Sequence, residues 1–407
     1  DINQVYPNRQ QEEVDGSTLL SFFTDRYEHV VLKEKELRVE RPHGHILMSG
    51  DNVNLENPVI TTTSYMYGIF NSQTVVGNTN FNKMTTNARN ALNVPKTSGQ
   101  RIYIGIEGTY QLLTMPSVFE MGFNYVRWYY KTSDDLLIIT NYTTVDTPEV
   151  RLNVRSEMGR AYPFLVTHQI SMNVSEYELP YQMQDHGDYL SFCADGAALS
   201  AEVYPELEYR LQIKGAKVTV SDERKLITRA EPGEASLLVV ELEACNEWTM
   251  TVQGLLHGEA LPLLEKQAEV EIERYRSFLS SVMNGFHLSK GTGNQPELFK
   301  VNALAWWYTH NMLVHYSVPH GLEQYGGAAW GTRDVCQGPV EYFMATQQYD
   351  QVRAIILTIF SHQYEEDGSW PQWFMFDHYS KVQQEESHGD IIVWPLKVLG
   401  DYLNVTR

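Results

Sequence analysis

The chain has 407 residues, of which 43% are hydrophobic and 20% charged, values typical of a globular protein rather than a disordered or fibrous one. Its formal net charge of −20 at pH 7 repels phosphate backbones and argues against nucleic-acid binding. The three cysteines are widely spaced and form neither a disulfide framework nor a metal motif. No apolar run reaches membrane-spanning length. We therefore expect a cytoplasmic protein without a metal or membrane partner.

Residues 1–262 have the pattern of β-strands. Runs rich in β-branched and aromatic residues occur at 101–106, 125–130, 135–142 and 236–243. Polar turn signals separate these runs. Many short strands joined by polar turns predict a β-sandwich domain over 1-262.

The periodicity changes to that of a helix at Leu263, where residues 263–279 carry charges on one face. We assign 263-290 to a helical linker and 291-407 to a helical domain. Pro296 is expected at the start of a long helix capped by Asn294 or Gln295. An apolar stripe is predicted along that helix, at Leu298, Val301, Leu304, Ala305, Tyr308, Met312 and His315. Further helices are predicted at 335–347, 351–363 and 391–403, the last with Pro395 in its first turn.

Three loops of the helical domain combine glycine, aromatic, amide and carboxylate residues, and each adjoins an apolar helical run. Aromatic faces stack on sugar rings, and Asp, Glu, Arg and Gln bind sugar hydroxyls. The loops therefore predict a carbohydrate cleft, in which Gly326 and Gly327 allow close approach to the backbone. Its predicted substrate-binding residues are Trp330, Arg333, Asp334, Gln337, Glu341, Trp370, Gln372, Trp373 and His388.

Each of these residues also has a purely structural interpretation. Asp334 and Asp390 each precede a helical run, where Asp commonly acts as the N-cap. Trp370 and Trp373 are either core aromatics or an exposed pair that flanks Gln372 as a sugar platform. Asp390 lies beside an apolar wall of Ile391, Ile392 and Trp394 that would raise the pKa of its carboxyl, whereas the helix dipole would lower that pKa. The sequence leaves these alternatives open.

Two segments carry a family resemblance: Gly331-Thr-Arg-Asp-Val-Cys-Gln-Gly-Pro-Val-Glu341 and Ser387-His-Gly-Asp-Ile-Ile-Val-Trp-Pro-Leu396. They resemble the motifs of glycoside hydrolase family 94, a family of inverting glycoside phosphorylases, and are most similar to its 1,2-β-oligoglucan branch. Cellobiose phosphorylases of the family carry an acidic residue where this chain has Gly338. The resemblance implies a β-sandwich, a helical linker and an (α/α)6 barrel. It also implies that Arg333 and Asp334 bind sugar and that Asp390 is the catalytic general acid.

The implied reaction is phosphorolysis of β-glucosidic bonds, with β-1,2-glucooligosaccharides as the expected substrate. Phosphate would be a co-substrate and no cofactor is implied. An inverting hydrolase that uses Glu341 as its base, or a non-catalytic carbohydrate-binding protein, remains an alternative. About four or five helices fit after residue 290, fewer than a complete barrel needs. We therefore expect a central fragment that lacks the rest of the barrel and its phosphate site; the quaternary state, a homodimer among the candidates, is left open.

The other carboxylates near the motifs suit the role of acid less well. Asp367 adjoins a Gly-Ser turn and is expected to be solvated, and Glu385 and Glu386 stand in a polar run. Asp334 follows Arg333, whose charge would keep it ionised. Asp377 is therefore the next candidate after Asp390.

Overall fold

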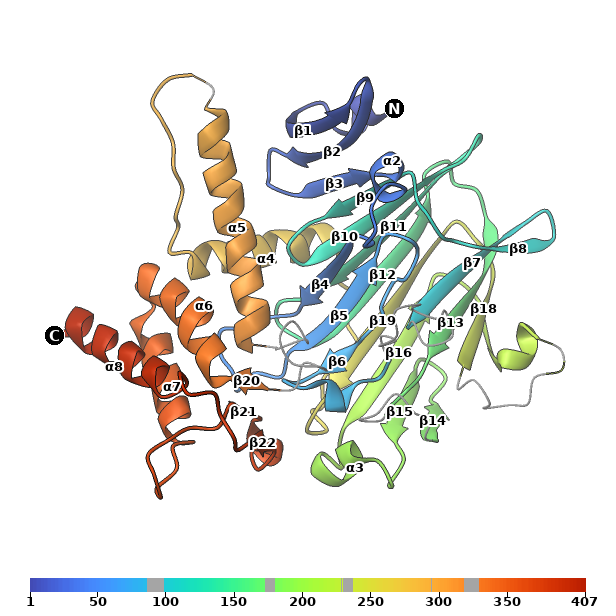
Figure 1. Ribbon diagram of the computed structural model, residues 1–407. Helices are drawn as coiled ribbons and strands as arrows, with labels where there is room; N and C mark the ends of the chain where they lie inside the picture. Colours follow the sequence, from blue (N-terminus) through green and yellow to red (C-terminus); the bar gives the residue numbers. More distant parts are fainter. Residues whose placement is uncertain (86–98, 173–179, 228, 230–236, 294, 318–328) are drawn as a thin grey trace. The chain divides into compact units, whose positions relative to one another are not determined.

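A computed structural model describes residues 1–407 except 86–98, 173–179, 228, 230–236, 294 and 318–328 (Figure 1). The chain divides into two compact units. Unit 1 contains Asp1–Gly50, Pro58–Val76 and Phe81–Tyr275, and unit 2 contains Asp51–Asn57, Gly77–Asn80 and Arg276–Arg407. Two short segments from the N-terminal part of the chain thus belong to the helical unit. Gly326 and Gly327 lie outside the described residues, as does Asn294.

Unit 1 is built on an eleven-stranded sheet, and every strand pairing recorded in the described part of the chain is antiparallel. In spatial order its strands are β1 (Arg9–Asp15), β2 (Thr18–Thr24), β3 (His29–Leu32), β9 (Val118–Met121), β10 (Tyr125–Lys131), β11 (Leu136–Thr143), β12 (Glu149–Ser156), β19 (Glu247–Leu255), β16 (Glu208–Lys214), β15 (Leu190–Ala194) and β14 (Tyr181–Asp185). The predicted runs at 125–130 and 135–142 are confirmed as β10 and β11.

A second sheet orders β17 (Val218–Asp222), β18 (Leu237–Cys245), β13 (Tyr162–Gln169), β7 (Gln100–Ile106) and β8 (Thr109–Leu112), so the runs at 101–106 and 237–243 are also confirmed. A small third sheet contains β4 (Gly44–Met48), β5 (Ile60–Tyr65) and β6 (Val75–Val76). Short helical segments complete unit 1: α1 (Ile2–Val5), α2 (Lys33–Glu36), η1 (Asn80–Asn82, which begins in unit 2), α3 (Leu199–Val203) and η3 (Glu223–Lys225).

Buried aromatic side chains fill the space between the sheets. Phe164 of β13 contacts Trp248 of β19 with ring centroids 5.5 Å apart. Trp128 of β10 is fully buried and packs against Phe70 and Phe119 at 4.7 and 5.2 Å. Such burial of large apolar area is the main source of folding free energy. The predicted β-sandwich is therefore confirmed.

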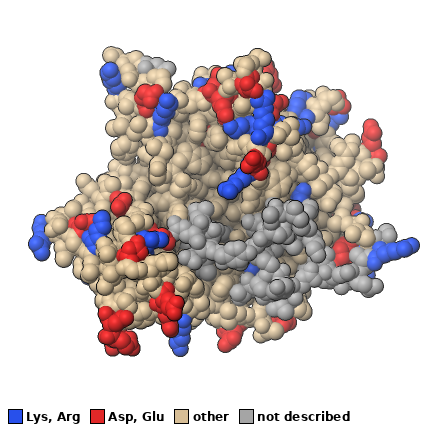
Figure 2. All heavy atoms as spheres, viewed as in Figure 1, with Lys and Arg blue, Asp and Glu red and all other residues tan. Residues whose placement is uncertain are grey.

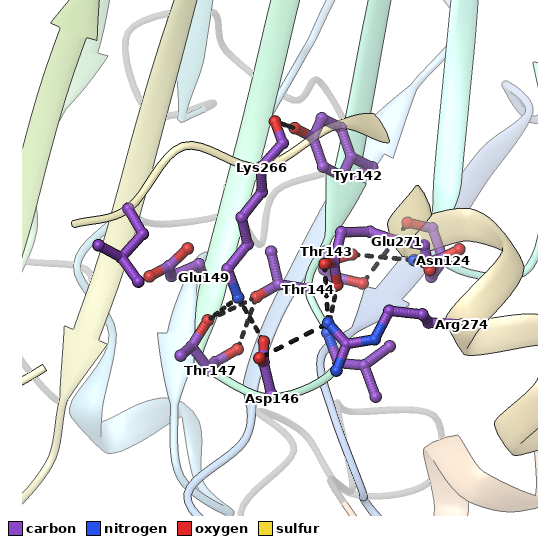
Figure 3. Close-up of polar contacts among 12 residues, drawn as sticks. Asn124, Tyr142, Thr143, Thr144, Asp146, Thr147, Glu149, Lys266, Glu271 and Arg274 are labelled. Carbon is purple, nitrogen blue, oxygen red and sulfur yellow. Dashed lines mark hydrogen bonds and ion pairs between the residues drawn. The ribbon is translucent and has the colours of Figure 1, made fainter. Parts of the chain in front are cut away.

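A polar network attaches the segment before α4 (Ala268–Val282), and the start of that helix, to the β11–β12 turn (Figure 3). The buried Glu271 carboxylate accepts hydrogen bonds from the Val145 amide at 2.9 Å and from Arg274 at 3.0 Å. Lys266 forms an ion pair with Asp146 and donates to Thr147 Oγ1 at 3.0 Å. A buried carboxylate is tolerated only when its oxygens are paired in this way. The helix predicted from Leu263 begins only at Ala268, because residues 263–267 have no regular secondary structure and are held to the sheet by hydrogen bonds from Tyr142 to Lys266 O and from Arg151 to Leu264 O.

Unit 2 consists of the end of α4 and four helices, with a small sheet beside them. The helices are α5 (Pro296–Ser317), α6 (Thr332–Ala345), α7 (Tyr349–Phe360) and α8 (Val393–Thr406). The sheet orders β20 (Trp330–Gly331), β21 (Trp373–Phe374) and β22 (Gln383–Gln384), and η4 (Asp377–Tyr379) lies between the last two. Pro296 opens α5 and Pro395 lies in the first turn of α8, as predicted.

The predicted stripe of α5 is only partly buried: Met312 is buried, but three of its apolar members are exposed. Val301, Leu304 and Tyr308 are 41%, 55% and 60% accessible to solvent, whereas the opposite face buries Ala303 and Leu313. The first turns also differ from prediction. Gly331 is the N-cap of α6 and Ile392 that of α8, so Asp334 and Asp390 are not N-caps.

Acidic and basic side chains are interspersed on the face of the molecule drawn in Figure 2. That face carries no concentrated basic patch among its described residues, in keeping with the expectation from net charge. In the described part of the chain, no helix is both long and apolar enough to cross a membrane.

Candidate active site

The three loops predicted to form a cleft meet in unit 2. Residue Trp330 pairs with Phe374, and Trp373 pairs with Gln384, in the sheet of β20, β21 and β22. Thr332 then fixes the start of α6, because its amide donates to Gln372 O at 3.0 Å and its hydroxyl to Pro371 O at 2.6 Å. The backbone therefore holds the first turn of α6 against the 370–374 loop.

Arg333 connects the first turn of α6 to the loop that contains Asp390. Its Nη1 donates a 3.0 Å hydrogen bond to Oδ2 of Asp390, and Trp394 Nε1 lies 3.4 Å from the same oxygen. The Arg333 Nε atom is 3.9 Å from Asp334 Oδ1. We call Arg333, Asp334, Asp390 and Trp394 the Arg333 cluster. One guanidinium thus lies beside two carboxylates at the surface.

The pKa of the Asp390 carboxyl is lowered, first by the hydrogen bond from Arg333 and then by that from Trp394. The sequence left open whether an apolar wall would raise this pKa. The structure places the side chain in solvent, with 46% of it accessible, because only Ile391 of the expected wall is buried. Of the two alternatives, desolvation of Asp390 is therefore wrong, and the reason that disfavoured Asp334 as an acid, a neighbouring Arg333, applies to Asp390 as well.

Asp334 lies in the first turn of α6, where a negative charge is stabilised by the helix dipole. Its Oδ2 atom occupies the space above Gly331, only 2.0 Å from where a Cβ on that glycine would be. The absence of a side chain at position 331 therefore lets the Asp334 carboxylate lie back over the start of the helix.

Two of the predicted aromatic contacts lie in the core. Trp370 is 1% accessible and donates its Nε1 hydrogen to Ile359 O at 3.1 Å. Trp330 is 2% accessible and donates to Tyr316 O at 2.8 Å. The expected exposed pair of Trp370 and Trp373 is therefore wrong, since buried backbone carbonyls satisfy the indoles. Trp373 is half-buried, and its Nε1 donates to Gln384 Oε1 at 2.8 Å.

The remaining predicted residues differ in burial, and Gln372 contacts the loop that carries Asp390. Gln372 Oε1 accepts a 2.9 Å hydrogen bond from the amide of the exposed His388, two residues before Asp390. Gln337 is half-buried on α6, and Glu341 is exposed one turn further along. Asp367, Glu385 and Glu386 are exposed, as expected. In the described residues no group of three or more His, Cys, Asp or Glu side chains is placed to hold a metal.

Sequence reasoning missed two contributors to the site. Trp394 was assigned to an apolar wall, but its indole donates to Asp390. Thr332 was not singled out, although it ties α6 to the 370–374 loop. A Trp four residues after an Asp at the start of a helix could have predicted the contact of Trp394 with Asp390, because that spacing brings the two side chains to one face of the helix.

Comparison with known proteins identifies the class to which the chain belongs. Residues 6–254 match the model of the glycoside phosphorylase supersandwich domain, so the chain belongs to that family. The family-level expectation from the two motifs is confirmed. The chain is also 43% identical over 408 residues to a 1,2-β-oligoglucan phosphorylase of Listeria innocua serovar 6a. That alignment covers 100% of this chain and 37% of the relative, so the chain spans little more than a third of the relative's length.

Among solved structures, the chain is similar to a bacterial glucoamylase complexed with acarbose, with a TM-score of 0.45 and 9% identity over 90% of this chain and 57% of that one. It is also similar to a polysaccharide lyase, with a TM-score of 0.31 and 8% identity over 49% of this chain and 33% of that one. Neither likeness is close enough to support a statement about function.

Proposed function

We propose that the protein containing this chain catalyses inverting phosphorolysis of β-1,2-glucooligosaccharides, releasing α-glucose 1-phosphate and a shortened glucan. The observation that carries the proposal is 43% identity along the entire chain to a protein named 1,2-β-oligoglucan phosphorylase, together with the family match of residues 6–254. Inorganic phosphate would act as nucleophile, so a second carboxylate base, which an inverting hydrolase requires, would not be needed.

The Arg333 cluster supports a sugar-binding role. A guanidinium donates hydrogen bonds and an ionised carboxylate accepts them, so the pair can hold two adjacent hydroxyls in a fixed orientation. The half-exposed Arg333 and Asp390 side chains are accessible to such hydroxyls. Gln372 would help by holding the backbone two residues before Asp390. We propose that Arg333, Asp334, Gln337, Glu341, Gln372, Trp373 and His388 contribute to this subsite.

We propose Asp390 as the proton donor to the leaving glycosidic oxygen, with one condition that follows from its geometry. While Arg333 donates to Asp390, the carboxylate is held ionised and has no proton to give. A bound sugar would have to draw Arg333 away before Asp390 could protonate the glycosidic oxygen. Asp377 is the alternative donor, and no metal or organic cofactor is needed for either scheme.

We propose that unit 2 is one part of an (α/α)6 barrel completed by further chain. Large apolar side chains are exposed on three of its helices, at Val301, Leu304 and Tyr308 on α5, Leu357 on α7, and Val393, Leu396, Leu403 and Val405 on α8. Exposed apolar area of this extent is expected where another element packs. The relative's greater length supplies chain enough to cover it.

The experiment that tests the function uses the full-length protein, a β-1,2-linked glucotriose and inorganic phosphate. The anomeric configuration of the sugar phosphate is read by NMR, and the phosphate on C1 prevents mutarotation, so the configuration reports the stereochemistry of the reaction. We expect the α-anomer from a β-linked substrate. Formation of the β-anomer, or of glucose in place of a sugar phosphate, would contradict the proposal.

A further inference from the structure

A cavity of about 550 Å³ lies in unit 2; none of the residues of the Arg333 cluster lines it, whereas Asp377, the alternative donor, does. Its walls come from Asp51, residues 53–56, Asn78, the end of α5, one face of α7 from Asp350 to Thr358, and the segment at Phe376 and Asp377. All of these residues belong to unit 2. The volume falls within the range of small-molecule sites, about 300–1,000 Å³. The two N-terminal segments that join the helical unit thus form one side of a ligand-sized hollow.

The charges around the cavity restrict what it can hold. Four carboxylates line it, those of Asp51, Glu56, Asp350 and Asp377, and no described lining residue is Lys, Arg or His. An anion such as phosphate would be repelled. A metal ion is also disfavoured, because among the described residues no three acidic or His side chains converge closely enough to bind one. The cavity therefore suits an uncharged ligand.

The same walls offer many hydrogen-bonding groups. Within the described residues, the carboxylates of Asp51, Glu56 and Asp350 have no hydrogen-bond partner, and each can accept from a ligand hydroxyl. The amide of Gln351 also lines the cavity and can both donate and accept. A ligand rich in hydroxyl groups would satisfy these atoms, whereas a purely apolar one would leave them desolvated and unpaired.

The cavity also has an apolar surface and a rigid frame. Phe376 lines it, with its ring held edge-on to the buried Trp330 at 4.8 Å, and can offer a face to the C–H groups of a sugar ring. Tyr316 Oη donates to Val53 O at 2.9 Å, and Asn78 Nδ2 donates to Asp377 Oδ2 at 3.3 Å. These two hydrogen bonds hold the two N-terminal segments against α5 and the segment at Phe376 and Asp377. Carboxylates, an amide and one aromatic ring together are typical of a carbohydrate subsite.

We infer that this cavity is a second carbohydrate site, which binds a segment of the glucan chain separately from the Arg333 cluster. The inference rests on the proposed function for the identity of the sugar, since the cavity itself defines only a neutral polyhydroxylated ligand. A site of this kind holds one part of a long oligosaccharide while another part occupies the cluster, so it adds affinity for long chains and none for short ones.

The test measures binding of β-1,2-linked glucose disaccharide and hexasaccharide to the full-length protein by titration calorimetry without phosphate. Ala354→Phe fills the cavity from α7, and Asp350→Asn removes one acceptor charge with little change of volume. Ala345→Phe, on the exposed side of α6 and outside the cavity, is the matched control. We expect both cavity variants to weaken hexasaccharide binding by about tenfold, the worth of one or two lost hydrogen bonds, while disaccharide affinity and the control stay unchanged.

Unchanged hexasaccharide affinity in both cavity variants would overturn the inference, as would an equal loss for disaccharide and hexasaccharide. Binding of Ca²⁺ that Asp350→Asn abolishes would also overturn it, because the cavity would then be a cation site. Phosphorolysis by the unmodified protein is measured in parallel. If hexasaccharide binding depends on the cavity but no sugar phosphate forms, the second carbohydrate site is supported and the proposed reaction is contradicted.

Discussion

Arg333 Nη1 donates a 3.0 Å hydrogen bond to Oδ2 of Asp390, a residue 57 positions further along the chain. The contact joins the first turn of α6 to the loop before α8, and thereby brings together the two motifs that carry the family resemblance. Both side chains are partly exposed, so the pair contributes little to stability. We propose that the pair instead orients a guanidinium and a carboxylate toward one ligand.

Asp390→Asn separates proton donation from sugar binding. If Asp390 is the acid, the variant should lose about 10²–10⁴-fold in kcat on oligosaccharides, the usual contribution of a general acid. It should keep its activity on glucosyl fluoride, whose leaving group needs no proton. Both rates are measured on full-length protein whose melting curve is unchanged. An equal loss on fluoride would show that Asp390 acts through binding, and Asp377 would then be tested as the donor.

Gly331→Ala should displace Asp334 without straining the backbone. The φ angle at Gly331 is −70°, which Ala adopts readily, but the new Cβ would meet Asp334 Oδ2 at 2.0 Å. We expect the KM for oligosaccharides to rise by about tenfold, the cost of losing one good hydrogen bond. Gly400→Ala on α8, with no atom within 4 Å of the added Cβ, is the control and should leave KM unchanged. Equal KM values for the two variants would show that the position of Asp334 is irrelevant to sugar binding.

Asp334→Asn tests the charge of the same residue. The variant keeps the shape of the side chain but removes the ionised acceptor, so oligosaccharide binding and kcat/KM should both fall while the cooperative melt is retained. Glu365→Gln, an exposed carboxylate elsewhere in unit 2, controls for the change in net charge. If Asp334→Asn instead melts at a clearly lower temperature and is fully active when folded, the role of Asp334 is to stabilise α6 and not to bind the sugar.

The sandwich should lose stability as pH falls below about 6.5. Burial lowers the pKa of His45 to about 4, while the unfolded chain has the ordinary value of about 6.5. Between these values the unfolded state binds more protons, so His45 lowers the free energy of unfolding as pH drops, by at most about 3 kcal/mol. Burial also lowers the pKa of His29 to about 4 and that of His168 to about 3, and both act in the same direction. Hydrogen exchange of β4 and β5 amides, corrected for intrinsic rates, should show this loss. His45→Gln should reduce the pH dependence, whereas the exposed His287→Gln should not. An identical profile in both variants would exclude His45 as its source.

The isolated chain of residues 1–407 should bind a hydrophobic dye and be inactive. The physical reason is the apolar side chains exposed on α5 and α8, Leu304 and Leu396 among them. Dye fluorescence and light scattering of this chain are compared with those of the full-length protein. A monodisperse, active preparation that binds no dye would contradict the proposal that further helices cover these faces.

The sequence predicted the β-sandwich, four of its strands and all four helices that follow the linker, because period-two and helical patterns are local properties. It could not place Asp51–Asn57 and Gly77–Asn80 in the helical unit, since no local pattern reveals where a loop packs. The sequence left open whether Trp370 is buried or exposed, because its partner, the carbonyl of Ile359, is a backbone atom that every sequence contains. The Arg333–Asp390 contact likewise depends on how α6 and α8 pack.

The central claim is that phosphate is the nucleophile. The most direct measurement incubates the full-length protein with β-1,2-linked glucotriose in parallel, with and without inorganic phosphate, and quantifies glucose 1-phosphate and free glucose. We predict glucose 1-phosphate in the phosphate-containing reaction and no turnover in its absence. Equal consumption of the trisaccharide in both reactions, with free glucose as the product, would contradict the account and identify a hydrolase.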